Sequence, residues 1–485
     1  MSTLTIHAEE TLGTISPYLH GHFAEHLGRC CYDGLWVGLD SAIPNTGGFR
    51  TDIINALKAV GVPQLRWPGG CFADSYHWRD GIGPAESRPR TWAESCGANV
   101  VETNALGTHE FMALCQAIGA DPYLAGNVGS GSVAELAGWI EYCNGTADTT
   151  LARERAANGH PASMNVKFWG VGNENWGCGG NYDAESYAKE FKRYATFLKM
   201  VDHSVQLVAC GLNDRTWNLK LVETMKDHLG LMDHLSVHQY WTHGPALSFS
   251  DDDYYQSFGA AAVEDDIRFT DDILRFFSAG KHNTGKHNIG IAFDEWGIWH
   301  PEAVVASNYE APSTVRDAVV GAGVLDVFHK WCSRVTTANI AQIVNVLQAL
   351  IQTSGDKMWL TPTYHLFHLY APHRGASAVR AEFEAVEVRE ALPLMSGSAS
   401  QKNGQLIVSL SNRHKDQPQE VTLSLRGAAV SGGILRTLAG KSDAHNTAEE
   451  PNAVSVIDSP LNASGDTLTL TLPACSVQTL TLSLA

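Results

Sequence analysis

The sequence has few basic residues, no long hydrophobic run and no low-complexity segment. Lys and Arg number 34 against 52 Asp and Glu, which gives a net charge of −18. Proteins that hold nucleic-acid phosphates need a basic patch, so this charge argues against a nucleic-acid partner. The absence of an 18-residue apolar run excludes a transmembrane helix. What is present is a chain of 485 residues, 44% of them hydrophobic, which can bury a large core.

The N-terminal segment "MSTLTIHAEETLG" has neither the basic region nor the apolar region of a signal peptide. We therefore expect a cytoplasmic protein. The ten cysteines include no CxxC pair, and in a chain without a secretion signal we expect them all to be reduced thiols. They lie at positions 30, 31, 71, 96, 115, 143, 178, 210, 332 and 475.

From about residue 15 to 375, short β-rich runs alternate with amphipathic helical stretches. Several runs are apolar throughout, which is typical of a parallel sheet covered on both faces. Eight runs favour a closed (β/α)8 (TIM) barrel over an open sheet, and no GxGxxG or GxxxxGK[ST] pattern indicates a nucleotide fold. The eight predicted strands are "SPYLHGHF", "PQLRWPGG", "DPYLAGNV", "VKFWGVGNE", "VQLVACGLN", "HLSVHQYW", "NIGIAFDEW" and part of "IAQIVNVLQ".

After residue 376 the hydrophobic period changes to two, as in "GQLIVSLSN" and "DTLTLTLPA". This alternation predicts an antiparallel, jelly-roll-like β-sandwich domain over residues 376–485. The domain has no cluster of catalytic side chains. We interpret it as a stabilising or assembly module, with carbohydrate binding as the alternative.

Polar residues follow the predicted barrel strands at their C-terminal ends, where the active sites of such barrels lie. Two of these ends share one pattern, an apolar run followed by Glu and Trp: "FWGVGNENW" carries Glu174 and "IAFDEWGIW" carries Glu295. Two carboxylates facing one cleft are what retaining glycoside hydrolysis requires. The strand ends carry Glu25, Arg66, Asn127, Asn173, Glu174, Tyr240, Asp294 and Glu295, and the nearby flat aromatic faces are those of Trp176, Trp296 and Trp299.

Charge and desolvation suggest different roles for the two acids. Arg66 can keep a neighbouring carboxylate ionised, and we assign that carboxylate to Glu295 as the nucleophile. Glu174 must begin protonated to act as the acid, and its apolar strand and Trp176 favour the protonated form.

Two interpretations that assign the chain to other classes of protein remain open. "HGHFAEH" places His20 and His22 on one side of a first strand, as in metal-dependent amidohydrolase barrels. His238 could supply a further ligand, but the fifth predicted strand has no His and the eighth has no Asp. A non-catalytic sugar-binding barrel would require the loss of one paired carboxylate, and both are present.

Longer motifs resemble glycoside hydrolase family 51, the intracellular exo-acting α-L-arabinofuranosidases. They include "HGHFAEHLGRC", "RWPGGCFADSYHWRDGIGP", "GVGNENWGCGG", "FDEWGIW" and "NIAQIVNVLQ", in order along nearly the whole chain. The resemblance implies retaining removal of terminal α-L-arabinofuranosyl residues from oligo- and polysaccharides, with no cofactor and no metal. It also implies that residues 1–14 join the sandwich, that residues 15–375 form the barrel, and that the protein is a homo-oligomer, such as a hexamer.

By the same resemblance, Glu174 is the acid/base and Glu295 the nucleophile. The substrate-binding residues implied are Glu25, Arg66, Cys71, Asn173, Tyr240, Trp296 and Thr361. Cys71 and Thr361 depart from the Asn and Gln of many family members, so β-D-galactofuranosidase or D-arabinofuranosidase activity is the alternative.

Overall fold

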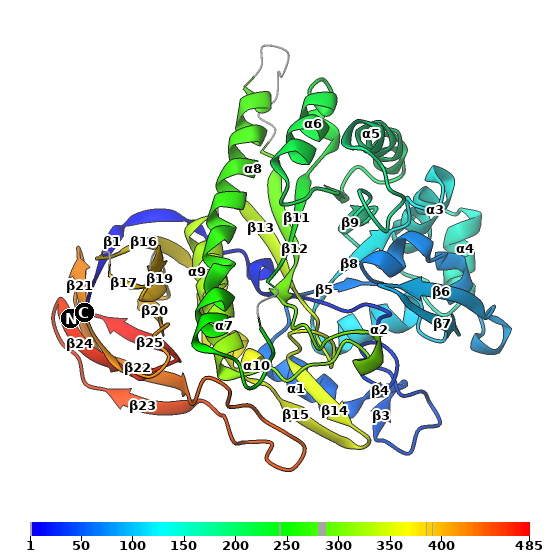
Figure 1. The fold of residues 1–485 in the computed structure, drawn as a ribbon. Helices are drawn as coiled ribbons and strands as arrows, with labels where there is room; N and C mark the ends of the chain where they lie inside the picture. Colours follow the sequence, from blue (N-terminus) through cyan, green and yellow to red (C-terminus); the bar gives the residue numbers. More distant parts are fainter. Residues whose placement is uncertain (1, 242–243, 280–287, 385, 390) are drawn as a thin grey trace.

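The computed structural model describes residues 2–241, 244–279, 288–384, 386–389 and 391–485. A closed barrel of parallel strands forms one part, and a nine-stranded sheet forms the other, with both chain termini in that sheet (Figure 1). The predicted eight-stranded barrel with a C-terminal sheet domain is therefore confirmed.

The barrel strands follow the chain order, and each neighbouring pair is parallel. They are β2 (Gly21–Phe23), β5 (Gln64–Trp67), β8 (Asp121–Gly126), β9 (Phe168–Val171), β10 (Gln206–Ala209), β11 (His234–Trp241), β12 (Gly290–Ile298) and β13 (Val335–Ala341). The last strand begins and ends earlier than predicted, and the chain leaves the sheet after Ala341.

Helices cover the outside of the barrel between these strands. They are α1 (Thr51–Val60), α2 (Thr108–Ile118), α3 (Val133–Asn144), α4 (Thr150–Ala157), α5 (Ala184–Val201), α6 (Arg215–Met225), α7 (Asp251–Gln256), α8 (Val263–Ser278), α9 (Val315–Lys330) and α10 (Pro362–Tyr370). In α5 the side chains of Tyr187, Phe191, Tyr194 and Leu198 form a buried apolar stripe, and the Asp183 side chain accepts from Ser186 N–H to cap the helix.

Helix α9 is buried on nearly every side, because it lies between the barrel and the C-terminal sheet (Figure 1). Its sequence is accordingly apolar or small around most of its circumference, including Gly321 and Gly323. An added Cβ at Gly321 would meet the Leu366 side chain at 2.7 Å, so this position needs glycine for close helix packing. The helix fixes the sheet domain against the barrel.

The C-terminal sheet is antiparallel apart from the β1–β21 pair, and it folds over its own core of Leu and Val side chains. In spatial order its strands are β23 (Ile457–Leu461), β22 (Val430–Ala439), β25 (Ser476–Leu484), β20 (Gln405–Asn412), β19 (Met395–Lys402), β16 (Ser377–Phe383), β1 (Ser2–Thr14), β21 (Gln419–Arg426) and β24 (Thr467–Leu472). The N-terminal strand β1 thus lies between two strands from the other end of the chain.

Four two-stranded pairs complete the strand structure. They are β3 (Asn45–Thr46) with β4 (Phe49–Arg50), β6 (Thr91–Ser95) with β7 (Ala98–Glu102), β14 (Ile351–Ser354) with β15 (Lys357–Leu360), and β17 (Glu387–Arg389) with β18 (Leu392–Pro393).

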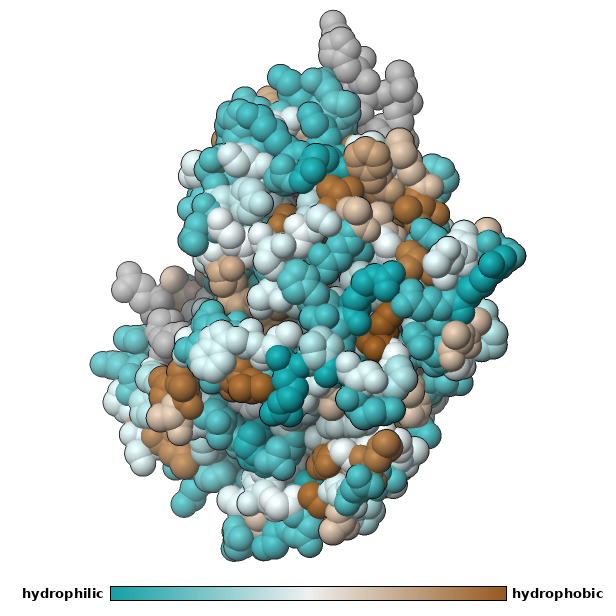
Figure 2. Space-filling model, turned by 90° about the vertical axis from the view of Figure 1, so that its right-hand side faces the viewer, coloured by the Kyte–Doolittle hydropathy of each residue, from teal (hydrophilic) through white to brown (hydrophobic). Residues whose placement is uncertain are grey.

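The face of the molecule drawn in Figure 2 is mostly hydrophilic, with its hydrophobic side chains in small separate groups. None of the helices in the described part of the chain is long and apolar enough to cross a membrane.

Three buried histidines join the barrel to the sheet. His20 and His329 contact each other through their Nε2 atoms at 2.9 Å, and His329 Nδ1 contacts the Ser398 hydroxyl of β19. His373 lies against His329 and contacts two further serine hydroxyls of the sheet through its ring nitrogens. Burial lowers the pKa of all three, that of His373 to about 3, so these rings are neutral in the folded protein.

We predict that acid destabilises this interface. The folded-state pKa of His373 is about 3, whereas the unfolded value is about 6.5. As the pH falls, the unfolded chain therefore takes up the proton before the folded chain does. The stability that neutral His373 contributes to the folded state is complete above pH 6.5 and is lost as the pH falls toward 3. Between pH 7 and pH 5, this group alone should lower the free energy of unfolding by about 2 kcal/mol, because one pKa unit corresponds to about 1.4 kcal/mol.

Urea unfolding at these two pH values measures the effect. The His373→Asn variant should lose about 2 kcal/mol less than wild type on acidification. The control His203→Asn, at an exposed position, should match wild type. The same pH dependence in all three chains would contradict the prediction.

Candidate active site

Two carboxylates meet at the C-terminal end of the barrel. Glu174 comes after strand β9, with Gly172 and Asn173 between them, and Glu295 lies within β12. A carboxylate oxygen of each lies within 4.8 Å of the other and of His238 Nδ1. This spacing is close to the roughly 5–5.5 Å that retaining glycosidases use, and it is shorter than the roughly 6.5–9.5 Å of inverting enzymes.

Glu295 is held by a hydrogen bond at each oxygen. Arg66 of β5 donates from Nη1 to Oε1 at 2.7 Å, and the Tyr240 hydroxyl donates to Oε2 at 2.9 Å. These two donors fix the orientation of the carboxylate. Such an arrangement suits a nucleophile.

Arg66 also organises its surroundings, although it is only 1% exposed. It donates from Nη2 to Asn173 Oδ1 at 2.7 Å, and its Nε lies 3.8 Å from the Asp294 carboxylate. Burial opposes ionisation of Asp294, but the charges of Arg66 and His238 hold its pKa well below the usual range. The guanidinium therefore has two carboxylates and one amide as partners, which satisfies a buried charge.

Glu174 stands on a sharp turn after β9. Its backbone φ is 44°, a left-handed conformation that is uncommon for a residue with a side chain. Gly172, two residues earlier, has φ 82°, and an added Cβ there would lie 2.1 Å from Asn175 Oδ1. The glycines of this segment thus let the chain reverse and present the Glu174 carboxylate, 18% exposed, to the cleft.

His238 of β11 lies between the two carboxylates. Its Nδ1 contacts Glu174 Oε1 at 3.0 Å, and its Nε2 lies 3.2 Å from Asp294 Oδ1. Burial alone would lower its pKa, but Glu295, Asp294 and Glu174 together raise the pKa to about 10. His238 is therefore a cation at neutral pH and donates to Glu174.

A buried Asp74 joins the loops that follow β5, β8 and β9. Its carboxylate accepts from the backbone N–H groups of Val128, Gly129 and Asn173, each at 2.7 Å. Burial raises its pKa to about 7 despite these hydrogen bonds. The contacts place Asn173 beside Arg66.

Glu25 forms the opposite wall of the cleft. It accepts from Gly70 N–H at 3.0 Å, from the Ser95 hydroxyl at 3.1 Å and from Gln342 Nε2 at 3.2 Å. Burial, together with the charge of Glu295, raises the pKa of Glu25 to about 7. Between Glu25 and Glu295 lies Gly70, where an added Cβ would lie 2.6 Å from Glu295 Oε1 and 3.5 Å from Glu25 Oε1, so this position needs glycine.

Comparison with known proteins agrees with this geometry. Residues 56–258 match the model of the α-L-arabinofuranosidase 1 domain, and residues 294–476 match that of the α-L-arabinofuranosidase C-terminal domain. An intracellular exo-α-L-arabinofuranosidase of Bacteroides ovatus is 41% identical over 99% of this chain and 95% of its own length. An intracellular exo-α-(1→5)-L-arabinofuranosidase of Bifidobacterium longum is 30% identical over 98% and 91%.

Solved structures also show similarity to arabinofuranosidases. The GH51 arabinofuranosidase of Xanthomonas axonopodis pv. citri superposes with a TM-score of 0.92 at 35% identity, and each chain is covered fully. The α-L-arabinofuranosidase of Thermotoga maritima, in its arabinose complex, superposes with a TM-score of 0.90 at 31% identity, again over both whole chains. The chain belongs to glycoside hydrolase family 51, the α-L-arabinofuranosidases. It is a glycosidase.

Most of the site residues predicted from the family resemblance come together in the cleft. Glu25, Arg66, Asn173, Tyr240 and the two catalytic candidates lie within one connected set of contacts. The amidohydrolase alternative is wrong, because the chain belongs to a glycosidase family and His20 pairs with His329 at the interface with the sheet.

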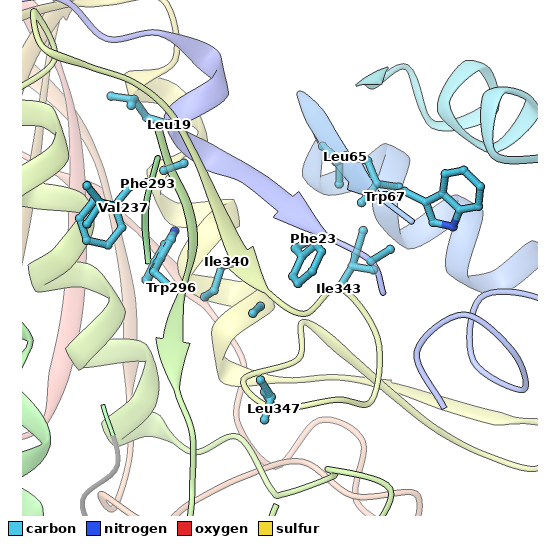
Figure 3. Packing of buried hydrophobic residues seen from close by; sticks show 14 of the residues in the cluster. Leu19, Phe23, Leu65, Trp67, Val237, Phe293, Trp296, Ile340, Ile343 and Leu347 are labelled. Atoms are coloured by element: carbon cyan, nitrogen blue, oxygen red, sulfur yellow. The ribbon is translucent and has the colours of Figure 1, made fainter. Parts of the chain in front are cut away.

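Trp296 does not face the cleft, so the prediction that it binds substrate is wrong. Its side chain is 1% exposed and packs against Phe328 and Phe367 in the layer between barrel and helices. Figure 3 shows it beside Phe293 and Ile340. The aromatic ring that accompanies the site is that of Trp299, which packs edge-on against Tyr240.

Thr361 also lies outside the site, contrary to prediction. It caps helix α10, where its hydroxyl donates to Ala349 O at 2.7 Å and accepts from Tyr364 N–H. A further amide at the site is that of Gln342, which comes directly after β13 and donates from Nε2 to Glu25 Oε2 at 3.2 Å. The sequence rule that strand ends carry function could have found Gln342, had the end of β13 been predicted correctly.

The expectation that all cysteines are reduced is wrong for two of them. Cys71 and Cys178 form a disulfide across the cleft wall, with their Cα atoms 5.5 Å apart. Their sulfurs lie 3.9 and 3.8 Å from Glu174 Oε2. Cys71 therefore lies beside the Glu174 carboxylate as part of a disulfide.

We predict that Gly70→Ala abolishes most of the activity while leaving the fold intact. The new Cβ would lie 2.6 Å from Glu295 Oε1 and 3.4 Å from Asn173 Nδ2, and so would displace the Glu295 carboxylate. A misplacement of about 1 Å costs about 10²-fold in rate. The kcat/KM for an aryl arabinofuranoside, with circular dichroism as the test of folding, measures this.

Gly177→Ala is the matched control in the same cleft wall, because its nearest neighbour would be Glu174 O at an ordinary 3.7 Å. If both variants lost activity equally, the space at Gly70 would not be the deciding feature.

Proposed function

We propose that this enzyme removes terminal non-reducing α-L-arabinofuranosyl residues from arabinose-containing oligo- and polysaccharides by double displacement. The observation that carries the proposal is the pair Glu174 and Glu295, with carboxylate oxygens within 4.8 Å of each other. That spacing leaves no room for a water between the acids and favours a covalent intermediate.

In the first step, the Glu295 carboxylate attacks the anomeric carbon of the bound furanose. The glycosidic bond breaks, and the leaving oxygen takes the proton of Glu174. Glu174 Oε1 is engaged by His238, so Oε2, which faces the disulfide, is the oxygen available to carry that proton. Glu25, Asn173 and Gln342 offer polar groups for the furanose hydroxyls.

In the second step, Glu174 acts as the base. It takes a proton from a water that enters after the leaving group departs, and the resulting hydroxide displaces Glu295 from the sugar. Arg66 and Tyr240 stabilise the departing carboxylate with the same hydrogen bonds that held it before attack. Two inversions give net retention of the anomeric configuration.

The cellular setting and assembly are also proposals. Relatives from Bacteroides ovatus and Bifidobacterium longum are named as intracellular, which supports a cytoplasmic location for this chain. A homo-oligomer, such as a hexamer, remains a prediction, and light scattering coupled to size-exclusion chromatography would test it.

Proton NMR tests the stereochemistry. Early product from an aryl α-L-arabinofuranoside should have the α configuration, because Glu295 and then water each invert the anomeric carbon. The same assay with a β-D-galactofuranoside and a D-arabinofuranoside tests the alternative furanoses. Early appearance of the β anomer would exclude the double displacement.

Variants of the two acids test their separate roles. Glu174→Ala should lose about 10²–10⁴-fold on substrates whose leaving group needs a proton. It should lose little in the glycosylation step for an activated aryl leaving group. Azide should then restore turnover and give a glycosyl azide of retained configuration, because this anion attacks the intermediate without base help.

Glu295→Ala should be inactive on every substrate, because no glycosyl-enzyme can form. If Glu174→Ala were equally inactive on activated and unactivated substrates, and azide rescued only Glu295→Ala with inversion, the two roles would be assigned wrongly.

A further inference from the structure

The Cys71–Cys178 disulfide lies against the proposed acid/base. Its two sulfurs are 3.9 and 3.8 Å from Glu174 Oε2, and these three ligand atoms all lie within 4.8 Å of one another. Such a cluster of two sulfurs and one carboxylate is unusual beside a catalytic group. It raises the question of what the cluster does when the disulfide is opened.

The disulfide is accessible to a reductant, because Cys178 is exposed. A dithiol attacks one sulfur, and its second thiol then releases the mixed disulfide. The protein S–S bond breaks and gains two electrons and two protons, while the dithiol is oxidised to its own disulfide. Cytoplasmic dithiols keep most protein cysteines reduced, so the proposed location exposes this pair to such a reaction.

We propose that the reduced Cys71 and Cys178 thiols, together with Glu174 Oε2, form an inhibitory binding site for a thiophilic divalent cation such as Zn²⁺. Binding releases the two thiol protons and the proton that Glu174 carries on Oε2 in its acid form, and it forms two metal–sulfur bonds and one metal–oxygen bond. Zinc prefers four ligands from sulfur, nitrogen and oxygen, and three protein ligands with one water are a common set. The disulfide form has no thiolate to offer, so oxidation removes the site.

A second set of candidate ligands is less suitable. Glu174, His238 and Glu295 also lie within 4.8 Å of one another. However, Glu295 already accepts from Arg66 and Tyr240, and His238 is held by three carboxylates that keep its nitrogens protonated. A metal would have to displace these protons and hydrogen bonds, whereas the thiols have no such competition.

The bound cation would block the enzyme at the acid/base. With Oε2 on the metal, Glu174 could neither give its proton to the leaving group nor take one from water. The cation would also occupy the side of the cleft through which the leaving group departs. Reduction would thus make the enzyme sensitive to zinc, and the disulfide would protect it.

Metal binding to the purified full-length chain tests the proposal. One sample is left oxidised, and the other is reduced with a dithiol that is then removed by gel filtration without oxygen. In equilibrium dialysis, the reduced chain should bind one more equivalent of Zn²⁺ than the oxidised chain. Co²⁺ in place of zinc should give the near-ultraviolet charge-transfer band of a thiolate complex in the reduced chain alone.

Three variants assign the ligands. Cys178→Ser should weaken zinc binding by more than about 100-fold, since the loss of a supporting group alone costs about 10–100-fold. Glu174→Gln should bind zinc more weakly but keep the cobalt–thiolate band. Cys332→Ser, whose buried thiol lies in the barrel–sheet part of the chain beside Gly13, is the matched control and should bind as wild type.

The test of inhibition by zinc rests on the proposed function, whereas the test of zinc binding does not. Zinc should inhibit arabinofuranoside hydrolysis by the reduced chain, reversibly on addition of a chelator, and should leave the oxidised chain active. If the reduced chain bound zinc but hydrolysed no arabinofuranoside, the proposed function would be contradicted and the proposed zinc site would stand. Equal zinc binding by the oxidised and reduced wild-type chains, or unchanged binding by Cys178→Ser, would overturn the site.

Discussion

A single buried guanidinium, that of Arg66, supports the whole catalytic end of the barrel. It is almost inaccessible to water, and the Glu295 and Asp294 carboxylates of β12 compensate its charge, while the Asn173 amide after β9 accepts a further hydrogen bond. An uncompensated buried charge would cost several kcal/mol. The position of each partner is therefore coupled to the others through this one group, which places the Glu295 carboxylate and the Asn173 amide together.

The backbone around Arg66 has to adopt conformations that ordinary strands avoid. Asp294 and Glu295 are consecutive, yet both face the cleft, which simple alternation along a strand forbids. Strand β12 shows register shifts against both neighbours in this stretch, and such irregularities re-aim side chains near active sites. Glu174 likewise reaches the cleft through a left-handed turn. These distortions are maintained by the hydrogen bonds of Arg66, Asp74 and His238.

The disulfide adds a chemical constraint at the same place. The proposed acid/base is in contact with His238 on one oxygen and with two sulfurs on the other. The two oxygens of Glu174 therefore lie in different surroundings, one beside a charged donor and the other beside a neutral disulfide. The state of Cys71 and Cys178 therefore bears directly on the group that transfers the proton, although neither cysteine takes part in that transfer.

The sequence by itself determined the barrel, the antiparallel C-terminal sheet and the placement of the two acids, because hydrophobic period and strand-end position are local properties. It also pointed to Arg66 and Tyr240 by the same rule. Only the tertiary structure decided which side Trp296 faces, because that prediction rested on its nearness to Glu295 in the sequence, and Trp296 packs instead against Phe328 on the helix side of β12. Thr361 became a helix cap, since the chain after β13 follows a path that no local pattern specifies. Cys71 and Cys178 are separated by 107 residues, and only the folding of two barrel loops around Asp74 brings their sulfurs within bonding distance.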